Sequence, residues 1–433
     1  MKKMSLASYV GILTGFLMLL SVHNVWAIPA FARKYQTSCV TCHAPFPTLT
    51  AVGESFRLNG YKLPNDELYV KDKPVSMGAE AYKKMFPDSV WPSDIPWMPP
   101  VSILVNSNIT TNFNGPETKK TKFNLPSDAS ILAAGTLGDD ISFFTELAFD
   151  NADSSSKVNA WLMYQGLGSK LFGDNHLNIK AGTVGDQELG LPNARNPGKF
   201  SNSDYLYHQA LAIDSHPGME LNGFGQIWRY AAGIVESDTT QNKKDYYAAF
   251  SLKFGGLGYS GINSKSASEE GISSSPTGYW RDDSIRMGVF AYRGFKDKDP
   301  DNAETYDRFG GDIRVNYSDL SLVGGYAYGK DRSITFNEDF PEQNIWFGEV
   351  DYYIFPWLIG FSRYESITTS NSDNSDENYS DRARIVPGFI LLARANVKAT
   401  LEAQFYTKDK FATAADHDTS FYNNMSFSLN WAY

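Results

Sequence analysis

Cys39, Cys42 and His43 form the pattern C-x-x-C-H, and their types and spacing point to one kind of chemistry. Two thiols three positions apart on a turn of helix can both reach the vinyl groups on one edge of a porphyrin. The histidine that follows can then bind the iron from the proximal side. The chain has only two cysteines, and both lie in this pattern. The spacing therefore predicts one covalent haem c, attached to Cys39 and Cys42 and ligated by His43.

Two other uses of these cysteines compete with haem attachment. A disulfide between Cys39 and Cys42 would make a thioredoxin-like redox site, but such a site needs a βαβ context, and none follows in the sequence. A structural zinc site needs four ligands, whereas this stretch supplies three. Haem attachment is the interpretation that accounts for all three residues.

The sixth ligand of the haem iron is not evident from the sequence. The candidates downstream of the motif are three methionines and three histidines: Met77, Met85, Met98, His176, His208 and His216. Methionine commonly fills gaps in protein cores, and this is the ordinary role for each of the three. Met98, which precedes two prolines, is the favoured distal ligand, and an open or weakly held sixth position is the alternative.

Residues 1–27 have the features of a secretory signal peptide. Lys2 and Lys3 give a positive start, residues 10–20 are mostly apolar, and Val25-Trp26-Ala27 resembles a cleavage site. The apolar run is too short for a transmembrane helix. Cleavage would leave 37 Lys and Arg residues against 49 Asp and Glu residues, a net charge of −12. This charge argues against nucleic acid as a partner and is compatible with the attraction of cations to a surface.

Residues 28–98 are predicted to form a small, mostly helical segment. The spacing of Leu49, Val52 and Phe56 predicts a helix from about Pro47 to Asn59, with Gly60 at its C-terminal cap. A segment of this size rarely buries enough apolar surface alone and relies on a cofactor or a neighbouring domain. A haem would supply much of that apolar bulk.

Short motifs around the C-x-x-C-H pattern resemble those of one protein family. They are Pro29-Ala30-Phe31-Ala32-Arg33, Pro47-x-Leu49, Gly53-x-x-Phe56 and Asn59-Gly60-Tyr61. With the haem motif they resemble the fused outer-membrane cytochrome–porin proteins of iron-oxidising bacteria. The close match runs from about Pro29 to Tyr61, and beyond it the resemblance is one of length and architecture.

Residues 99–433 have the texture of a transmembrane β-barrel. No apolar run approaches the length of a membrane-spanning helix. Segments of about ten residues alternate in polarity instead, as in Ile141–Phe149 and Leu320–Tyr328, which would place one set of side chains on lipid and the other in the lumen. The last nine residues alternate and end on Tyr433, as the closing strand of a bacterial outer-membrane barrel does. The aromatic content of 14% suits girdles at the two membrane interfaces.

The segments number about sixteen, so an all-β transmembrane barrel of about sixteen antiparallel strands is the predicted fold class, with the N-terminal c-type cytochrome segment beside it. Their predicted starts are Val101, Ala129, Ile141, Val158, Leu177, Met219, Gln226, Tyr246, Ile285, Tyr306, Leu320, Asn344, Trp357, Arg384, Val397 and Phe421. An even number leaves both termini on the periplasmic side, so the haem segment would begin at that mouth and plug the lumen in part. A soluble sandwich or propeller is the alternative, but no repeat of forty to fifty residues is present.

Three further patterns carry little weight. Gly256–Gly261 matches the dinucleotide-binding pattern G-x-G-x-x-G, but a polar loop rather than a helix follows it. The acidic stretch Ser366–Asp381 has the composition of a solvated outer loop, although carboxylates there could gather ferrous ions. His417 lies between Asp416 and Asp418 in a loop and is expected to be exposed to solvent.

The family resemblance implies a function. It implies an outer-membrane electron conduit with Fe(II) oxidase activity, which passes one electron from extracellular Fe(II), or another one-electron donor, through the haem to a periplasmic carrier. Two alternatives remain: export of electrons to an extracellular acceptor, and a solute porin with a structural haem.

Overall fold

The computed structural model describes residues 30–63, 70, 75, 80–90, 99–113, 120–151, 155–185, 189, 206–239, 242–261, 280–299, 302–333, 340–370, 381–409 and 423–433. Its helices are short. They are α2 (Ala30–Tyr35), the 3-10 turn η1 (Cys39–Thr41), α3 (Ala51–Leu58), α4 (Glu80–Met85), α5 (Ser169–Phe172) and α6 (Leu206–Leu211). Among these residues, no helix is long and apolar enough to cross a membrane.

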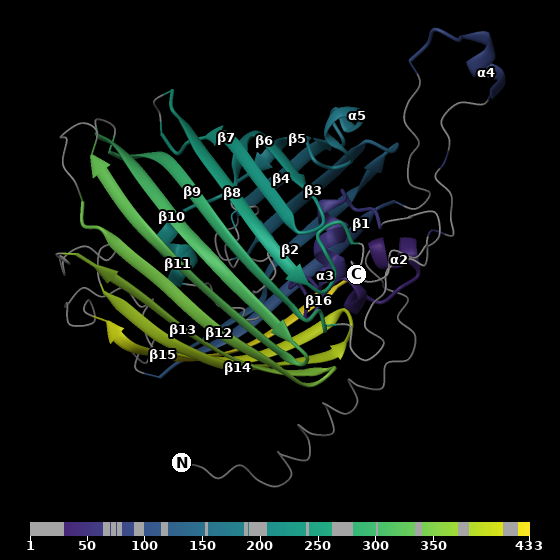
Figure 1. The fold of residues 1–433 in the computed structure, drawn as a ribbon. Helices are drawn as coiled ribbons and strands as arrows, with labels where there is room; N and C mark the ends of the chain where they lie inside the picture. Colours follow the sequence, from purple (N-terminus) through teal and green to yellow (C-terminus); the bar gives the residue numbers. More distant parts are fainter. Residues whose placement is uncertain are drawn as a thin grey trace.

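A closed barrel of antiparallel strands makes up most of the described chain (Figure 1). The strands are β1 (Val101–Asn112), β2 (Thr121–Leu137), β3 (Ile141–Asp150), β4 (Ser155–Tyr164), β5 (Asn178–Val184), β6 (His216–Phe224), β7 (Trp228–Glu236), β8 (Lys244–Gly255), β9 (Ser284–Asp299), β10 (Asn302–Tyr317), β11 (Leu320–Ser333), β12 (Gln343–Phe355), β13 (Leu358–Thr369), β14 (Arg382–Arg394), β15 (Val397–Asp409) and β16 (Asn424–Ala432). Each strand pairs with the next along the chain, and β1 pairs with β16 to close the barrel.

The predicted barrel of about sixteen strands is confirmed, because each predicted segment corresponds to one strand. Most predicted starts lie within four residues of the observed ones. The exception is β2, which begins at Thr121 rather than near Ala129. Residues Lys122 to Leu125 alternate in polarity, but Pro126, Ser127 and Asp128 follow them and resemble a turn, which separated these residues from the rest of the strand in the sequence pattern.

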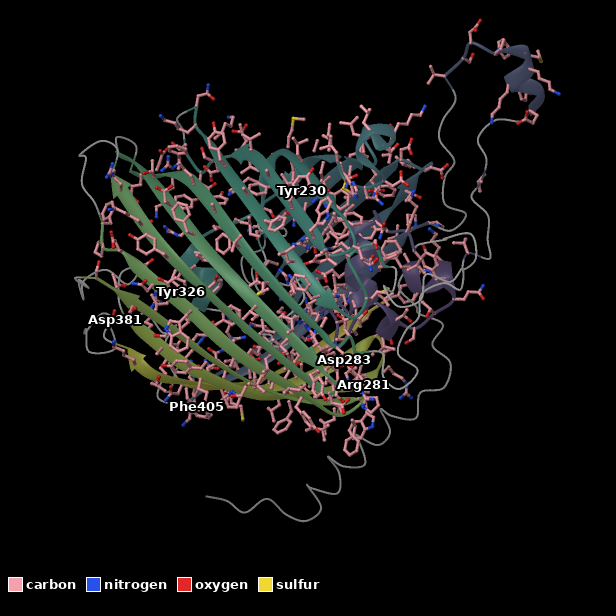
Figure 2. All side chains as sticks on the ribbon, viewed as in Figure 1. Tyr230, Arg281, Asp283, Tyr326, Asp381 and Phe405 are labelled. Atoms are coloured by element: carbon pink, nitrogen blue, oxygen red, sulfur yellow. The ribbon has the colours of Figure 1, made fainter. Side chains whose placement is uncertain are left out.

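The two faces of the barrel wall differ in the way a membrane barrel requires. Large apolar side chains cover the outer face and remain exposed, among them Tyr326 and Phe405, which Figure 2 labels. Inward-facing charged residues such as Arg363 and Glu365 are fully buried. Exposed aromatic residues also gather at the turn between β12 and β13, where Phe355 stacks on Trp357 with ring centroids 5.2 Å apart.

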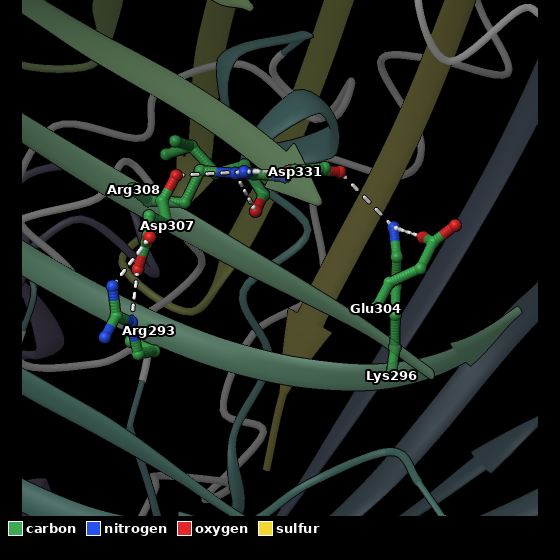
Figure 3. A network of polar contacts seen from close by, with 7 residues as sticks. Arg293, Lys296, Glu304, Asp307, Arg308 and Asp331 are labelled. Atoms are coloured by element: carbon green, nitrogen blue, oxygen red, sulfur yellow. Dashed lines mark hydrogen bonds and ion pairs between the residues drawn. The ribbon is translucent and has the colours of Figure 1, made fainter. Parts of the chain in front are cut away.

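Part of the lumen is occupied by the connection between β5 and β6. Within it, α6 packs on the inner wall at β12 and β13, and Tyr207 contacts the ring of Phe347 at 4.9 Å. Leu211 and Ile213 are fully buried there. Arg308 of β10 donates from Nε to the carbonyl of Leu211 at 3.1 Å and pairs with Asp331, within the polar network in Figure 3. These contacts hold the connection inside the barrel.

The N-terminal segment, residues 30–63, lies at one end of the barrel, which we call the plug end (Figure 1). It contacts opposite parts of the inner wall. Ala44 belongs to a buried cluster with Tyr353 and Ile359, from β12 and β13, whereas Tyr61 stacks on Trp161 of β4 at 5.8 Å. The opposite end, where β6 begins, is called the loop end. Residues 1–29, including the predicted signal peptide, lie outside the described residues.

Candidate haem-binding site

The C-x-x-C-H motif forms a compact turn that is tied to helix α3. Cys39 begins η1, and the amides of Cys42 and His43 both donate to the carbonyl of Cys39, at 3.2 and 2.9 Å. Thr50 caps α3, because its hydroxyl oxygen accepts from the amide of Gly53 at 3.1 Å. The same hydroxyl donates to the carbonyl of Thr41 at 2.9 Å. One residue therefore starts the helix and fixes the motif against it.

The observed helix is shorter at its start than the sequence indicated. It begins at Ala51 rather than near Pro47, because residues 44–50 form a turn in which the amide of Ala44 donates to the carbonyl of Thr48 at 2.9 Å. At its other end, Asn59 is the cap and Gly60 has a φ of +65°, a left-handed conformation that glycine adopts without strain. The predicted cap is therefore one residue too late: Asn59, not Gly60, caps the helix.

His43 is held in the form that binds a metal. Its Nδ1 lies 3.2 Å from the carbonyl oxygen of Pro47, and a carbonyl can only accept, so Nδ1 carries the proton. The lone pair of Nε2 is then the group able to bind iron, and a backbone partner of this kind is a common way to orient a ligating histidine. Burial lowers the pKa of His43 to about 4, although the carbonyls of Pro47 and Thr48 oppose this shift. The imidazole is therefore neutral at pH 7, as ligation requires.

Cys39 and Cys42 are both free thiols and both half-buried. Burial raises the pKa of Cys39, and burial together with the nearby Cys39 raises the pKa of Cys42 to about 12. Because a thiolate is the species that attacks a disulfide, neutral thiols resist oxidation to the disulfide that competed with haem attachment. Among the described residues, no group of three or more His, Cys, Asp or Glu side chains is arranged to hold a metal ion.

Gly53 lets α3 approach the motif backbone to backbone. A Cβ at this position would lie 1.9 Å from the carbonyl oxygen of Cys42, which is far inside van der Waals contact. No other residue type fits without moving the helix away from the motif. Gly53 was part of the family resemblance, and the structure gives a physical reason for it.

We expect Gly53→Ala to destabilise the N-terminal segment by about 1–3 kcal/mol, the usual cost of overpacking. The measurement is the ratio of covalent haem to barrel in purified protein, together with the rate at which protease cleaves the segment. Gly348→Ala on β12 is the matched control, because nothing lies within 4 Å of its added Cβ. Equal haem content and equal cleavage rates in the two variants would contradict the packing argument.

The motif faces a cavity of about 1000 Å³ between the N-terminal segment and the barrel wall. Cys39, Cys42 and His43 all line it, so the structure brings the three predicted haem residues to one space. The opposite wall comes from β1 to β4, β15 and β16. This volume is at the upper end of the range for cofactor sites, about 300–1,000 Å³.

An aromatic cluster forms the apolar part of this cavity. Phe31 packs against Phe56 at 4.9 Å and stacks on Tyr61 at 5.0 Å, while Tyr35 meets Phe56 edge-on at 5.6 Å. All four rings line the cavity. From the sequence, Phe31, Phe56 and Tyr61 were recognised only as parts of a family motif. In the structure they form one surface suited to a flat, apolar macrocycle.

Of the candidates for a sixth ligand, the structure describes the side chains of three, and one of these lines the cavity. Met77, Met98 and the side chain of His208 lie outside the described residues. Met85 is 67% exposed on α4, and His176 packs on Trp228 at 5.1 Å; neither lines the cavity. His216 does line it, with Nδ1 3.8 Å from the carboxylate of Asp238. No methionine is present among the described residues that line the cavity.

The discounted patterns also have structural outcomes. In the glycine pattern, the amide of Leu257 donates to the carboxylate of Asp282 at 2.8 Å, so an anion of the protein already uses it, and residues 262–279 are outside the described part. Asp381 accepts from Lys408 at 2.9 Å, whereas the rest of the acidic loop, residues 371–380, is not described. His417 is likewise outside the described residues.

The barrel is similar to solved outer-membrane porins. The trimer form of OmpT from Vibrio cholerae has a TM-score of 0.51 and 12% identity, over 77% of this chain and 98% of that chain. An anion-selective porin from Comamonas acidovorans has a TM-score of 0.53 and 9% identity, over 77% and 98%. Salmonella typhi OmpF in complex with daunomycin has a TM-score of 0.51 and 9% identity, over 77% and 97%.

At such low identity these likenesses establish the fold alone, which is that of an outer-membrane porin barrel. This fold supports an outer-membrane location. No protein-family model and no curated protein matches the sequence. The resemblance to cytochrome–porin fusions therefore stays a prediction that rests on the N-terminal motifs.

Proposed function

We propose that this protein is an outer-membrane electron conduit that oxidises extracellular Fe(II) through one covalent haem c and passes the electron to a periplasmic carrier. The observation that carries the proposal is the convergence of Cys39, Cys42 and His43 on one large cavity with aromatic walls. Free thiols, a neutral oriented imidazole and an apolar space of this size are what attachment of a haem requires.

The chain's own residues would divide the work as follows. Cys39 and Cys42 would each form a thioether, and His43 would bind the iron through Nε2 while Pro47 keeps its ring in place. Phe31, Phe56 and Tyr61 would exclude water from one face of the macrocycle. The haem, once bound, supplies a centre that accepts and releases one electron, with a potential set by its ligands and surroundings.

A conduit of this kind answers a physical problem of distance. The hydrocarbon core of a bilayer is about 30 Å thick, which is too far for efficient transfer in a single tunnelling step. A haem held within a barrel lets donor and acceptor approach from opposite ends. In this orientation the plug end would face the periplasm.

Access from the loop end supports the same proposal. The cavity that contains the haem motif is also lined by Asp214, His216 and Asp238, and His216 begins β6 at the loop end. Asp214 and Asp238 attract cations to this part of the cavity, while Lys157 and Lys398 also line the cavity. A hydrated ferrous ion is the donor that this charge suits.

The second candidate is a solute porin in which the haem has a structural role. The similarity to solved porins favours it, since those barrels match this one over most of their length. The N-terminal segment and α6 count against a wide aqueous pore, because both lie against the inner wall. Loss of the haem would leave solute flux intact under the porin alternative and would abolish electron transfer under the conduit proposal.

Stopped-flow mixing tests the conduit proposal and its direction. The purified oxidised protein is mixed with Fe(II), and the reduced protein with Fe(III), while the haem absorbance is followed. Rapid reduction by Fe(II) supports oxidation of iron. Oxidation of the reduced haem by Fe(III), with no reduction by Fe(II), would reverse the direction to electron export. A haem that neither ion changes would leave the porin alternative.

A further inference from the structure

One face of α3 lines the cavity beside the haem motif. Gly53, Phe56 and Arg57 all contribute to the cavity wall. Gly53 lies against the carbonyl of Cys42, and Arg57 is one helical turn further on, about 6 Å along the axis. Arg57 is thus a cation on the same helix as the glycine that contacts Cys42, and it lines the same cavity as Cys42.

A haem needs two kinds of surface. Its macrocycle is apolar, whereas its two propionates are anionic and form strong, charge-assisted hydrogen bonds with a guanidinium. The rings of Phe31, Phe56 and Tyr61 supply the apolar surface. Arg57 supplies a positive charge to the cavity that these rings line.

We propose that Arg57 binds a haem propionate and, through that contact, raises the reduction potential of the haem. This inference rests on the proposed covalent haem. A guanidinium presents a planar fork that matches a carboxylate, which a lysine does not. Its positive charge also stabilises the iron in the reduced state, which carries one unit less positive charge.

A competing role for Arg57 lies on the same helix. Glu54 is three residues earlier, and Arg57 is one of the cations whose charge acts on it. Under that role Arg57 would only help to hold α3 in the barrel, with Glu54 turned towards Arg229 of β7 at 3.7 Å. Removing Arg57 would then loosen the segment and raise ion conductance without changing the haem potential.

The test is the midpoint potential of the full-length, haem-loaded protein, measured by optical redox titration. We expect Arg57→Gln to favour the oxidised haem by about tenfold, which for a one-electron couple is a fall of about 59 mV. Lys157→Gln is the matched control, because Lys157 lines the same cavity but is exposed and screened by solvent. We expect its potential to remain close to that of the wild type.

Arg57→Lys keeps the charge but loses the fork. We expect Arg57→Lys to recover most of the wild-type potential and to shift the propionate bending vibrations in the resonance Raman spectrum. If Arg57→Gln does not mature with haem, the Raman shift of Arg57→Lys tests the inference instead. An unchanged potential in haem-loaded Arg57→Gln, an equal fall in Lys157→Gln, or unchanged propionate vibrations in Arg57→Lys would overturn the inference. Wild-type protein without covalent haem would refute the proposed function instead.

Discussion

Replacing both Cys39 and Cys42 with serine is expected to reduce covalent haem to background while leaving the barrel folded. A thioether forms when a thiol adds across a vinyl group of the porphyrin, and a serine hydroxyl does not make this bond. The strands depend on neither residue, since both cysteines lie in the N-terminal segment. Haem staining of the denatured polypeptide measures the first effect, and the heat-dependent gel migration typical of folded barrels measures the second.

The single variants make this result sharper. Cys39→Ser or Cys42→Ser alone leaves one thiol able to form a thioether, so we expect reduced haem content rather than none. The solute flux of the double variant then tests the porin alternative, which predicts that the flux stays intact after loss of the haem. Haem that remains covalently bound to the double variant would show that attachment occurs elsewhere and would refute the assigned site.

Glu54→Gln is expected to release the N-terminal segment from the barrel. Glu54 is a buried carboxylate of α3, 3.7 Å from the guanidinium of Arg229, and both side chains are 6% exposed. Removing one partner of a buried pair leaves the other charge without compensation, which costs about 3–5 kcal/mol. A cost of this size shifts the docking equilibrium by more than a hundredfold. Planar-bilayer recordings should therefore show large open events that the wild type lacks.

A matched substitution controls for the loss of charge itself. Glu236→Gln removes the same group from an exposed pair with Lys244 at 2.7 Å. Exposed pairs contribute about 1 kcal/mol or less, so this variant should conduct like the wild type. Equal conductance in the two variants would show that Glu54 does not anchor the segment.

The same contact predicts a dependence on pH. Burial would raise the pKa of Glu54, but Lys253, Arg286, Arg229 and Arg57 outweigh it and hold this pKa below its usual value of about 4.3. The charged carboxylate of Glu54 therefore stabilises the docked segment fully at a pH above the usual pKa. This stabilisation is lost as the pH falls through the lowered pKa. Acidification through this lowered pKa should open the wild-type channel. Asp282 and Asp312 also pair with cations of this cluster. The contribution of Glu54 is therefore the part of the pH dependence of conductance that is absent from Glu54→Gln.

The strands were predictable because each presents a two-residue period to lipid and lumen, and that period repeats around the barrel. The final strand is the clearest case, since Phe427, Leu429 and Trp431 face outward while Ser426 and Ser428 are buried. The first half of β2 was missed, because Pro126, Ser127 and Asp128 interrupt the alternation and resemble a turn. A local pattern therefore identifies a strand only where the alternation continues without a break.

The residues of the candidate haem site were predictable, but their surroundings were not. The sequence identifies Cys39, Cys42 and His43 as candidates, because haem attachment requires these residue types at this spacing. The contact of His43 with Pro47 and the approach of Gly53 to Cys42 depend on the turn formed by residues 44–50, which has no simple periodic signal. The inward course of α6 depends on distant partners such as Arg308, which a linear pattern does not link to Leu211.

The central claim is that a covalently bound haem, held by the N-terminal segment inside an outer-membrane barrel, takes electrons from Fe(II). Its most direct test is an absorbance spectrum of the detergent-purified, full-length protein before and after anaerobic addition of Fe(II). We predict a Soret band that stays with the denatured polypeptide and that shifts to the reduced form when Fe(II) is added. A purified barrel with no Soret band would contradict the account.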